Sequence, residues 1–397
     1  MRLENKTVLL GVSGGIAAYK SASLASMLVK DGADVRVILT EHAQEFIRPL
    51  TFESLTGHRC YCDLFAQDDE FKAPHIGLAQ KADAIIIAPA TANVVSKLAC
   101  GIADDMLTTT VLASKAPKLI VPAMNSDMYL NPVTQENLAK LSSLGMEVIT
   151  PDTGHLACGD EGIGKMPEPE VLYEHLLCVL AHEKDMTGMH VLVSAGPTQE
   201  ALDPVRYLTN HSSGKMGYCL AKECMLRGAD VTLITGKTNL NPPLHTEVVP
   251  VLSAQDMSTA IKEHSENADL ILMAAAVADY RPENEASEKI KKTGENQTIT
   301  LSPTEDILAY LGAHKKPGQY LCGFSMETEN LVENSRKKLT EKKLDMIVAN
   351  NVKEEGAGFE TDTNIVTLIT PDTEMELPLM SKEEAAGEIL DQILSER

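Results

Sequence analysis

The sequence predicts an α/β protein with two open, Rossmann-like sheets of parallel strands, one in each half of the chain. Continuous runs of β-branched residues and Leu, four to six residues long, alternate with segments of helix length. Such runs are typical of strands that helices cover on both faces. The order of these segments in the first half returns in the second half, and this repetition indicates two domains of similar architecture.

The first strand of each half ends in a turn that contains glycine. Residues 7–12 (TVLLGV) precede the turn Ser13–Gly15, and residues 191–195 (VLVSA) precede Gly196. Each turn leads into an expected helix. In both halves the sequence GADV, at residues 32–35 and 228–231, then joins this helix to a second strand. The second strands read VRVILT and VTLITG.

The third and fourth strands also match between the halves. An Ala-Asp pair precedes AIIIAPATAN in the first half and LILMAAAVADY in the second. The fourth strands, KLIVPAMN and LDMIVANN, end near Asn125 and Asn350. Because open α/β sheets bind ligands at the carboxyl ends of their strands, we expect the binding sites at these turns.

A polar segment, Leu180–Gly188 (LAHEKDMTG), separates the two repeats. We therefore expect one domain over residues 1–189 and a second over residues 190–397. The end of the chain, SKEEAAGEILDQILSER, predicts an amphipathic helix that Ser381 caps, because a Glu follows three residues later.

Composition excludes several classes of partner. The 397 residues carry a net charge of −22, which argues against duplex nucleic acid and anionic membranes. No apolar run reaches about 18 residues, the length that spans a bilayer, and the first residues lack a signal-peptide pattern. The eight cysteines are scattered, as in reduced proteins. We expect a cytoplasmic protein with small-molecule ligands.

Neither half contains a common nucleotide signature. The turn after the first strand is not G-x-G-x-x-G, and Thr209 occupies the position where a P-loop ahead of Gly214–Lys215 needs its first glycine. These departures disfavour an NAD(P)-dependent oxidoreductase with a tandem Rossmann core, which is the second interpretation of the strand pattern.

Polar groups at the strand ends of the first half suit a mononucleotide such as FMN. A turn between a strand and a helix presents N–H groups and a hydroxyl to an anion. Because parallel strands end at one edge of a sheet, the groups after the other strands are expected beside this turn. The candidate flavin-binding residues are Ser13, Gly14, Gly15, Thr40, Ala88, Thr91, Asn93 and Thr108.

Three further residues of the first half suit chemistry on a bound ligand. His75 precedes a helix, and Asn125 follows the fourth strand, where its amide could bind a carboxylate. Cys158 lies in a glycine-rich segment, Ala157–Met166, and a thiol on such a flap could meet a ligand as a proton donor.

The second half has a long polar loop between its first strand and the next helix. Hydrogen-bond donors crowd this loop, which favours a phosphate-bearing ligand. The small side chains of Ala274, Ala275 and Ala276 permit close approach by a base or sugar, and Asp279 could hold Mg²⁺ or a ribose. The cluster Lys289–Lys292 suits a triphosphate. The donors of the loop are Thr198, Arg206, Asn210, His211, Ser212, Ser213 and Lys215.

These motifs resemble those of a known family over nearly the whole chain. SGGIAAYK, PHIGLA, APATAN, PAMNSDMY and ACGDEGIGKM resemble the flavin-dependent phosphopantothenoylcysteine decarboxylase domain, a flavodoxin-like flavoprotein (HFCD-type). AGPTQEALDPVRYLTNHSSGKMG, AAAVADYRP and KIKK resemble the phosphopantothenate–cysteine ligase domain. Their order is that of the bifunctional bacterial proteins of coenzyme A biosynthesis. Tyr129 departs from the family pattern, which often has Trp there.

For the first domain, the resemblance implies an FMN-dependent decarboxylation that yields 4'-phosphopantetheine. Oxidation of the cysteinyl thiol gives a thioaldehyde that accepts the electrons as CO2 leaves, and reduction follows. The resemblance assigns carboxylate binding to Asn125, a helper role to His75 and proton donation to Cys158.

For the second domain, the resemblance implies a ligase that uses CTP and Mg²⁺. The carboxylate of 4'-phosphopantothenate attacks the α-phosphate and releases pyrophosphate, and the amine of L-cysteine then displaces CMP. Asn210 would steady the acyl-cytidylate, Lys289 would serve the second step or the phosphates, and Asp279 would be the metal ligand. The implied CTP contacts are Ala274, Ala275, Ala276, Asp279, Lys289, Asp306, Ile307, Phe324, Lys338 and Lys342.

The resemblance also implies an assembly of copies of the chain. Flavin sites would be shared across trimer contacts and the ligase domains would pair, which together build a homododecamer. A third interpretation is a flavin-binding regulatory subunit without activity, as some relatives of the first half are. The presence of His75, Asn125 and Cys158 favours catalysis.

Overall fold

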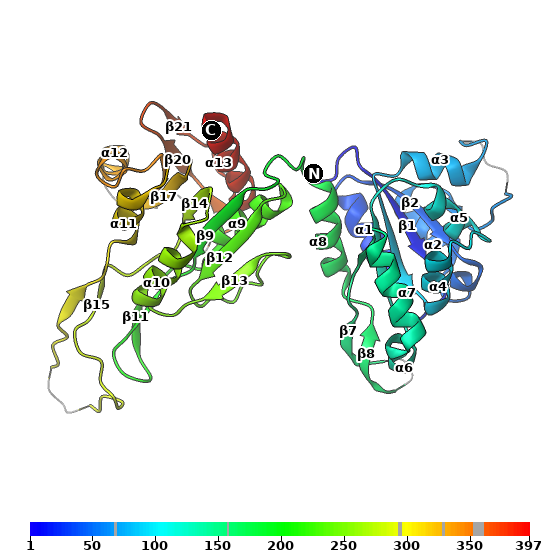
Figure 1. Cartoon of the computed structure of the whole chain (residues 1–397), viewed down its shortest axis with the longest axis horizontal. Helices are drawn as coiled ribbons and strands as arrows, with labels where there is room; N and C mark the ends of the chain where they lie inside the picture. The colour runs from blue at the N-terminus through cyan, green and yellow to red at the C-terminus, as the bar shows by residue number, and fades with distance from the viewer. Residues whose placement is uncertain (67–69, 157–158, 293–295, 328–329, 352–360) are drawn as a thin grey trace. The chain divides into compact units, whose positions relative to one another are not determined.

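The structure is a computed structural model that describes residues 1–66, 70–156, 159–292, 296–327, 330–351 and 361–397. The chain divides into two compact units, Met1–Glu183 and Lys184–Arg397 (Figure 1). The sequence analysis placed the boundary six residues later, directly before the first strand of the second half. Both units are open α/β sheets, as predicted from the sequence. Among the described residues, no helix combines the length and apolar composition that crossing a bilayer requires.

The first unit contains a six-stranded parallel sheet in the order β3-β2-β1-β4-β5-β6. From β1 the strand order runs through β2 and β3 toward one edge and through β4, β5 and β6 toward the other, so it reverses between β1 and β4. In open α/β sheets, ligands bind at the carboxyl ends of the two strands where the order reverses. All residues of both strands are buried, which explains their uninterrupted apolar sequence. The strands are β1 (Thr7–Val12), β2 (Asp34–Leu39), β3 (Cys60–Tyr61), β4 (Ala84–Ala90), β5 (Lys118–Pro122) and β6 (Glu147–Val148).

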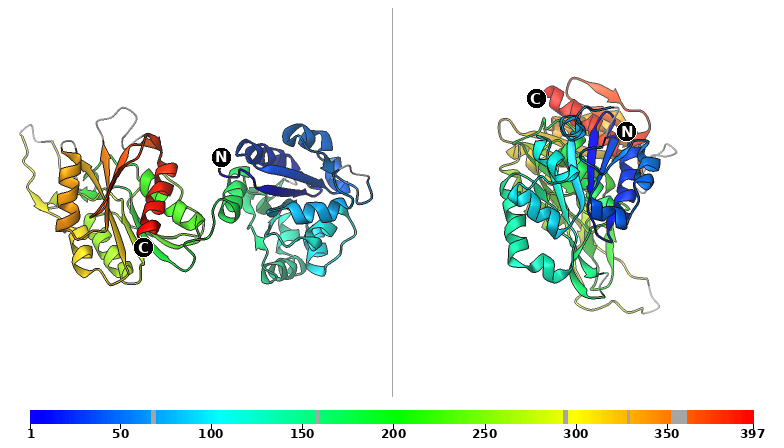
Figure 2. Two further views of the ribbon diagram at one scale, coloured as in Figure 1. Left: turned by 90° about the horizontal axis from the view of Figure 1, so that it is seen from above. Right: turned by 90° about the vertical axis from the view of Figure 1, so that its right-hand side faces the viewer.

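Helices cover both faces of this sheet (Figure 2). Apolar side chains of α3, α4, α5 and α7 share one core with β1, β4 and β5, while α1 contacts α2 and α8. The helices are α1 (Ala18–Lys30), α2 (Pro49–Thr56), α3 (Pro74–Lys81), α4 (Ala92–Cys100), α5 (Met106–Ala113), α6 (Ser126–Leu130), α7 (Pro132–Ser143) and α8 (Pro169–Leu180), with a 3-10 turn η1 over Glu41–Glu45.

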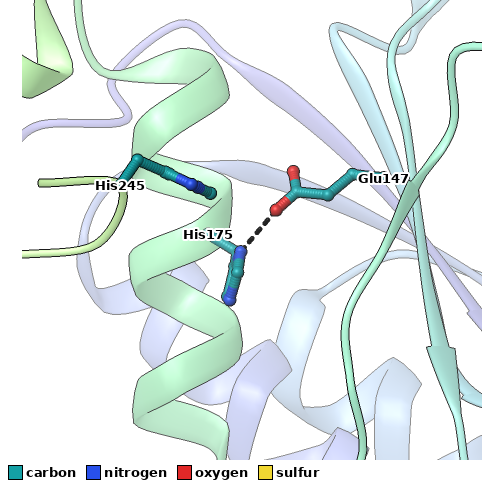
Figure 3. Close-up of side chains that lie close together, drawn as sticks. All are labelled: Glu147, His175 and His245. Atoms are coloured by element: carbon teal, nitrogen blue, oxygen red, sulfur yellow. Dashed lines mark hydrogen bonds and ion pairs between the residues drawn. The ribbon is translucent and has the colours of Figure 1, made fainter. Parts of the chain in front are cut away.

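The short edge strand β6 is tied to helix α8 by a polar contact. Figure 3 shows Nδ1 of His175, on α8, directed at Oε1 of Glu147, on β6, at 2.5 Å. Both side chains are largely buried, so this contact fixes the last helix of the unit against the edge of the sheet.

An antiparallel hairpin, β7 (Asp152–His155) and β8 (Glu161–Lys165), follows the sheet. Its second strand lies against the residues after β5: the N–H of Met124 donates to the carbonyl of Gly164 at 3.1 Å. Gly164 has φ +136° and a Cβ there would lie 2.1 Å from the Met124 carbonyl oxygen. Only glycine permits this approach. The close packing of the hairpin against Met124 therefore explains why the predicted flap has a glycine at position 164.

The second unit contains an eight-stranded sheet in the order β13-β12-β9-β14-β17-β18-β20-β21. The first six strands are parallel, and β20 and β21 add an antiparallel edge. The strands are β9 (His190–Ala195), β12 (Asp230–Thr235), β13 (Glu247–Pro250), β14 (Leu270–Met273), β17 (Tyr320–Glu327), β18 (Met346–Asn351), β20 (Val366–Ile369) and β21 (Glu374–Glu376).

In the described part of the second unit, five helices accompany this sheet, and the last confirms the capped helix predicted at the end of the chain. Ser381 accepts from the N–H of Glu384, whose carboxylate accepts in return from the N–H of Ser381. The helices are α9 (Lys215–Leu226), α10 (Ala254–Ser265), α11 (Ile307–His314), α12 (Leu331–Glu341) and α13 (Lys382–Glu396).

Two long hairpins extend from the same side of the second unit (Figure 1). The first, β10 (Gln199–Ala201) and β11 (Tyr207–Thr209), forms within the segment that the sequence indicated to be a polar loop. The second is β15 (Tyr280–Pro282) and β16 (Leu301–Pro303). A further short pair joins β19 (Thr363–Asn364) to β22 (Met380–Ser381).

Candidate functional site

The first unit has a cavity of about 490 Å³ at the carboxyl ends of β1, β4 and β5. This volume lies in the range of small-molecule and cofactor sites. Its walls come from the turn after β1, the turns after β4 and β5, and the β7–β8 hairpin. The lining residues are Gly14, Gly15, Ile16, Ala17, Tyr19, Lys20, Thr91, Ala92, Ala123, Met124, Asn125, Met128, His155, Leu156, Gly164, Lys165 and Met166.

Ser13 joins two of these turns. Its buried hydroxyl donates to the carbonyl of Pro89 at 2.7 Å and accepts from the N–H of Thr91 at 3.0 Å. The turn after β1 and the turn after β4 are therefore held together, and this link sets the spacing of Gly14, Gly15 and Thr91 around the cavity.

Gly14 and Gly15 differ in their surroundings. A Cβ at Gly14 would lie 2.5 Å from Cβ of His42, so this glycine is required by packing. At Gly15 the nearest atom would be Cγ2 of Thr91 at 3.8 Å, an ordinary contact, so the space beside it is open to a ligand. Helix α1 begins here without a side-chain cap at Ala17. The N–H groups of Ala18 and Lys20 donate to the carbonyls of Gly15 and Ala17, both at 3.0 Å, so an anion here would bind to N–H groups of the turn before the helix.

Of the other predicted flavin residues, Thr40, Thr108 and Ala88 form hydrogen bonds within the protein itself. Thr40 caps η1 by accepting from the N–H of Ala43, and Thr108 forms a buried capping box with Asp105. The carbonyl of Ala88 accepts from Ser21 at 2.5 Å. These residues are not among those that line the cavity, and Asn93 is exposed in the first turn of α4.

The residues with predicted chemical roles are not all in one place. Asn125 lines the cavity as the N-cap of α6, where Oδ1 accepts from the N–H of Asp127 at 2.9 Å. His75 begins α3 and is not among the lining residues; its Nδ1 is buried without a hydrogen-bond partner in the described part of the chain. Cys158 lies outside the described residues, while Leu156 and Gly164 on either side of it line the cavity.

Lys20, which was not predicted from the sequence as a site residue, is buried and lines the cavity. Its ammonium group donates to the carbonyl of Met166 at 2.8 Å and to Oε1 of Glu168 at 2.9 Å. This hydrogen bond from Lys20 lowers the pKa of Glu168. A lysine directly after the run Ile16–Tyr19 is the sequence signal that could have indicated it, since charged groups are seldom buried without a partner.

In the second unit, the strand ends of β9 and β14 are joined by hydrogen bonds. The N–H of Ala275 donates to the hydroxyl of Ser194 at 3.1 Å, and the N–H of Ala276 donates to the carbonyl of Gly196 at 3.0 Å. The side chain of Asn210, at the end of β11, donates to the carbonyl of Ala276 at 3.1 Å. The structure therefore brings Asn210 and the predicted alanines together at one strand end.

Asp279 and Lys289 lie on the β15–β16 side of this strand end, and both are exposed. Asp279 directly precedes β15, and its carbonyl accepts from the N–H of Thr304 at 2.9 Å. Lys289 lies in the segment that joins β15 to β16, beside Ile290, which contacts the β10–β11 turn.

The remaining predicted nucleotide contacts come from α11, β17 and α12. Asp306 caps α11 by accepting from the N–H of Ala309 at 3.0 Å, and it pairs with the ammonium of Lys342 at 2.9 Å. Burial opposes ionisation of Asp306, but the hydrogen bond from Lys342 and the backbone N–H groups outweigh it and lower its pKa. Ile307 is buried beside this cap, whereas Phe324 on β17 and Lys338 on α12 are half-buried.

Two protein-family models match the chain, one for each unit. The model described as Flavoprotein matches residues 1–180, and the model described as DNA/pantothenate metabolism flavoprotein C-terminal domain matches residues 186–396. The second match alone covers more than half of the chain.

Relatives match the chain over almost its full length. The coenzyme A biosynthesis bifunctional protein CoaBC of Bacillus subtilis (strain 168) is 48% identical over 98% of this chain and 97% of its own. The protein of the same name from Escherichia coli (strain K12) is 41% identical over 100% of this chain and 98% of its own.

Two solved structures each match about half of the chain or less. The C-terminal domain of a coenzyme A biosynthesis bifunctional protein CoaBC is 46% identical, with 52% of this chain and 95% of that chain covered and a TM-score of 0.45. A PPC decarboxylase mutant with bound pantothenoylaminoethenethiol is 32% identical, with 43% of this chain and 96% of that chain covered and a TM-score of 0.39. Because the full-length relatives agree with both family models, the chain belongs to the family of bifunctional proteins of coenzyme A biosynthesis.

Proposed function

We propose that this chain catalyses two successive reactions of coenzyme A biosynthesis. The second unit joins 4'-phosphopantothenate to L-cysteine with CTP, and the first unit decarboxylates the product to 4'-phosphopantetheine. The observation that supports this most directly is the match to bifunctional relatives over 98% of the chain at 48% identity. We assign the decarboxylase to residues 1–183 and the ligase to residues 184–397, the two compact units.

The first unit suits FMN. The uncapped start of α1 and the open space beside Gly15 fit a phosphate, and Thr91 adds a hydroxyl at the same wall. When bound, FMN supplies the oxidation and reduction of the cysteinyl group that make loss of CO2 possible. We expect Ser13 to act through the turn that it holds, since its hydroxyl is already bonded to Pro89 and Thr91.

The residues of the chain would then orient and protonate the substrate. Asn125 lies at the cavity wall and would hold the carboxylate through its amide. Cys158 would donate the proton that completes the product, and the β7–β8 hairpin beside the cavity would exclude water. His75 lies apart from this wall, and in an assembly with flavin sites between copies it would serve a neighbouring site.

The second unit suits CTP with Mg²⁺. The half-buried alanines after β14 have small side chains that permit close approach by a base or sugar, and Asn210 is bonded to the same strand end. Asp279 offers an exposed carboxylate, and Mg²⁺ is usually held by one or two carboxylates together with substrate phosphates. Lys289 and the other lysines of its cluster would balance the charge of the phosphates.

The assembly that we propose is a homododecamer of trimers and dimers in the cytoplasm. Exposed apolar side chains beside the first cavity support a covering copy, because such patches on soluble proteins usually mark contacts. Ile16 is 61% exposed, Tyr19 62% and Met128 49%, and all three line the cavity.

Two measurements on the purified full chain test the two activities independently. Pyrophosphate release should require CTP, phosphopantothenate and cysteine together, and no release under these conditions would contradict the ligase. The protein should also be yellow and release CO2 from phosphopantothenoylcysteine. Cys158→Ser should end product formation and keep the flavin bound, and normal turnover by this variant would show that the proton donor is another group.

A further inference from the structure

Asp203 is a buried carboxylate in an otherwise exposed turn between β10 and β11. Its side chain is fully buried, although Arg206 beside it is 48% exposed. It accepts hydrogen bonds from the N–H groups of Val205 and Arg206, both at 2.9 Å, and from Nε of Arg206 at 3.0 Å. A buried charge is costly unless it is paired, so the turn is built around this group.

Asp203 and Arg206 also hold a residue that is distant in sequence. The N–H of Ile290 donates to Oδ2 of Asp203 at 3.1 Å, and the carbonyl of Ile290 accepts from Nη2 of Arg206 at 2.8 Å. Both polar groups of the Ile290 backbone are thus bound by one ion pair. We call this arrangement the Asp203 clamp: Asp203, Arg206 and Ile290.

The clamp fixes the segment that contains Lys289. Ile290 follows Lys289 directly, and a second contact lies three residues before it, where the N–H of Ala286 donates to the carbonyl of Leu202 at 3.0 Å. Lys289 is therefore confined between two attachments to the β10–β11 turn. The same hairpin continues through β11 to Asn210, so one element positions both predicted ligase residues.

We propose that Asp203 is a positioning residue of the ligase, which holds the Lys289 segment in place through Arg206 and Ile290. This inference rests on the proposed function of the second unit. A lysine on an unrestrained loop would lose conformational entropy in every turnover, and the clamp removes most of that cost before the substrates bind. A carboxylate is suited to this task because it accepts from several donors at once and holds the planar guanidinium against the turn.

The test compares Asp203→Asn with a control that breaks another Asp–Arg pair of the same unit. The amide has nearly the same shape but presents an NH2 group to donors, so the clamp should open. A misplacement of about 1 Å lowers rates by about 10², and we expect a fall in kcat of this order with little change in KM for CTP. Asp391→Asn removes one of the two carboxylate partners of Arg227, at 2.7 Å, and should leave kcat unchanged.

A second readout does not depend on activity. Lys289, Lys291 and Lys292 are exposed, and a lysine-specific protease cleaves after each of them once the segment can leave the turn. Without substrates, Asp203→Asn should be cleaved there faster than the wild type and the Asp391→Asn control. Arg206→Lys keeps the charge but loses the forked guanidinium that reaches the carbonyl of Ile290. This variant should therefore behave like Asp203→Asn. It can be used instead if Asp203→Asn does not fold.

Each result separates this inference from the proposed function. Equal cleavage rates in all variants would overturn the clamp, and faster cleavage with an unchanged kcat would overturn the positioning role. A wild-type protein that releases no pyrophosphate would instead contradict the ligase, and faster cleavage of Asp203→Asn would then still support the clamp.

Discussion

At the scale of single residues, two adjacent glycines of the turn after β1 are expected to differ when each is changed to alanine. A Cβ at Gly14 would overlap His42, so Gly14→Ala should lower the free energy of unfolding by about 1–3 kcal/mol. Gly15→Ala has room and should stay within about 1 kcal/mol of the wild type. Thermal unfolding of the flavin-free protein measures both.

The same two variants test the flavin site. The methyl group of Gly15→Ala would fill the space beside the start of α1, so this variant should bind FMN more weakly despite its normal stability. Equal flavin content in Gly15→Ala and the wild type, measured by absorbance after dialysis, would place the phosphate elsewhere.

Local sequence indicated some site residues and could not indicate others. Gly14, Gly15 and Asn125 follow directly from strand ends, because the turn chemistry and the strand are adjacent in sequence. Lys20 was missed because its burial depends on Glu168, 148 residues away. Asp203 was missed for the same reason, since its role depends on Ile290, 87 residues further along the chain.

At the scale of elements, Asp306 joins the start of α11 to the end of α12 in two separable ways. Asp306→Ala removes both the cap and the ion pair and should cost about 1–2 kcal/mol. Asp306→Asn keeps the cap and loses only the partly exposed ion pair, for about 0.2–1 kcal/mol. Urea unfolding at pH 7 should rank the wild type first, the Asn variant second and the Ala variant last.

The contribution of the ion pair should depend on pH. The folded pKa of Asp306 is lowered, so its stabilisation is complete above the ordinary value of about 3.9 and is lost as the pH falls through the folded pKa. The difference between the wild type and Asp306→Asn should therefore disappear in acid. A difference that persists there would show that the pair with Lys342 is not its cause.

Four parallel strands in each unit were predicted from the sequence. The parallel strand β17 was missed, so β18 was taken as the fourth strand of the second half, and the short parallel strands β3, β6 and β13 and the antiparallel strands were missed as well. A continuous apolar run such as Ala84–Ala90 indicates a buried parallel strand from the local sequence alone, without knowledge of which strands lie beside it. In contrast, β20 and β21 are short, and their turn is closed by a hydrogen bond between the side chains of Thr370 and Thr373. The β10–β11 hairpin was interpreted as a loop because its strands have only three residues each and mixed polarity.

At the scale of the whole molecule, each unit should fold alone. Each has its own apolar core, and residues 184–189 pack on the second unit: the buried side chain of Met186 and the ion pair of Asp185 with Arg227 lie there. A fragment of residues 184–397 should therefore be more stable than one of residues 190–397 by about 1.5–3 kcal/mol, the value of one buried Met. Equal denaturation midpoints of the two fragments would show that these residues add nothing.

The assembly can be tested at the apolar rim of the first cavity, because the proposed trimer contact and dimer contact lie on different units. Tyr19→Arg places a charge on a 62% exposed apolar position of the cavity wall, where a covering copy would have to bury it. The wild type should have a native mass of twelve chains, and the variant should fall to dimers because pairing of the ligase units is untouched. Leu144→Arg, at a 60% exposed position after α7 and away from this wall, is the control and should keep the full mass. If light scattering gives the same mass for Tyr19→Arg and the wild type, the cavity wall that includes Tyr19 is not part of the trimer contact.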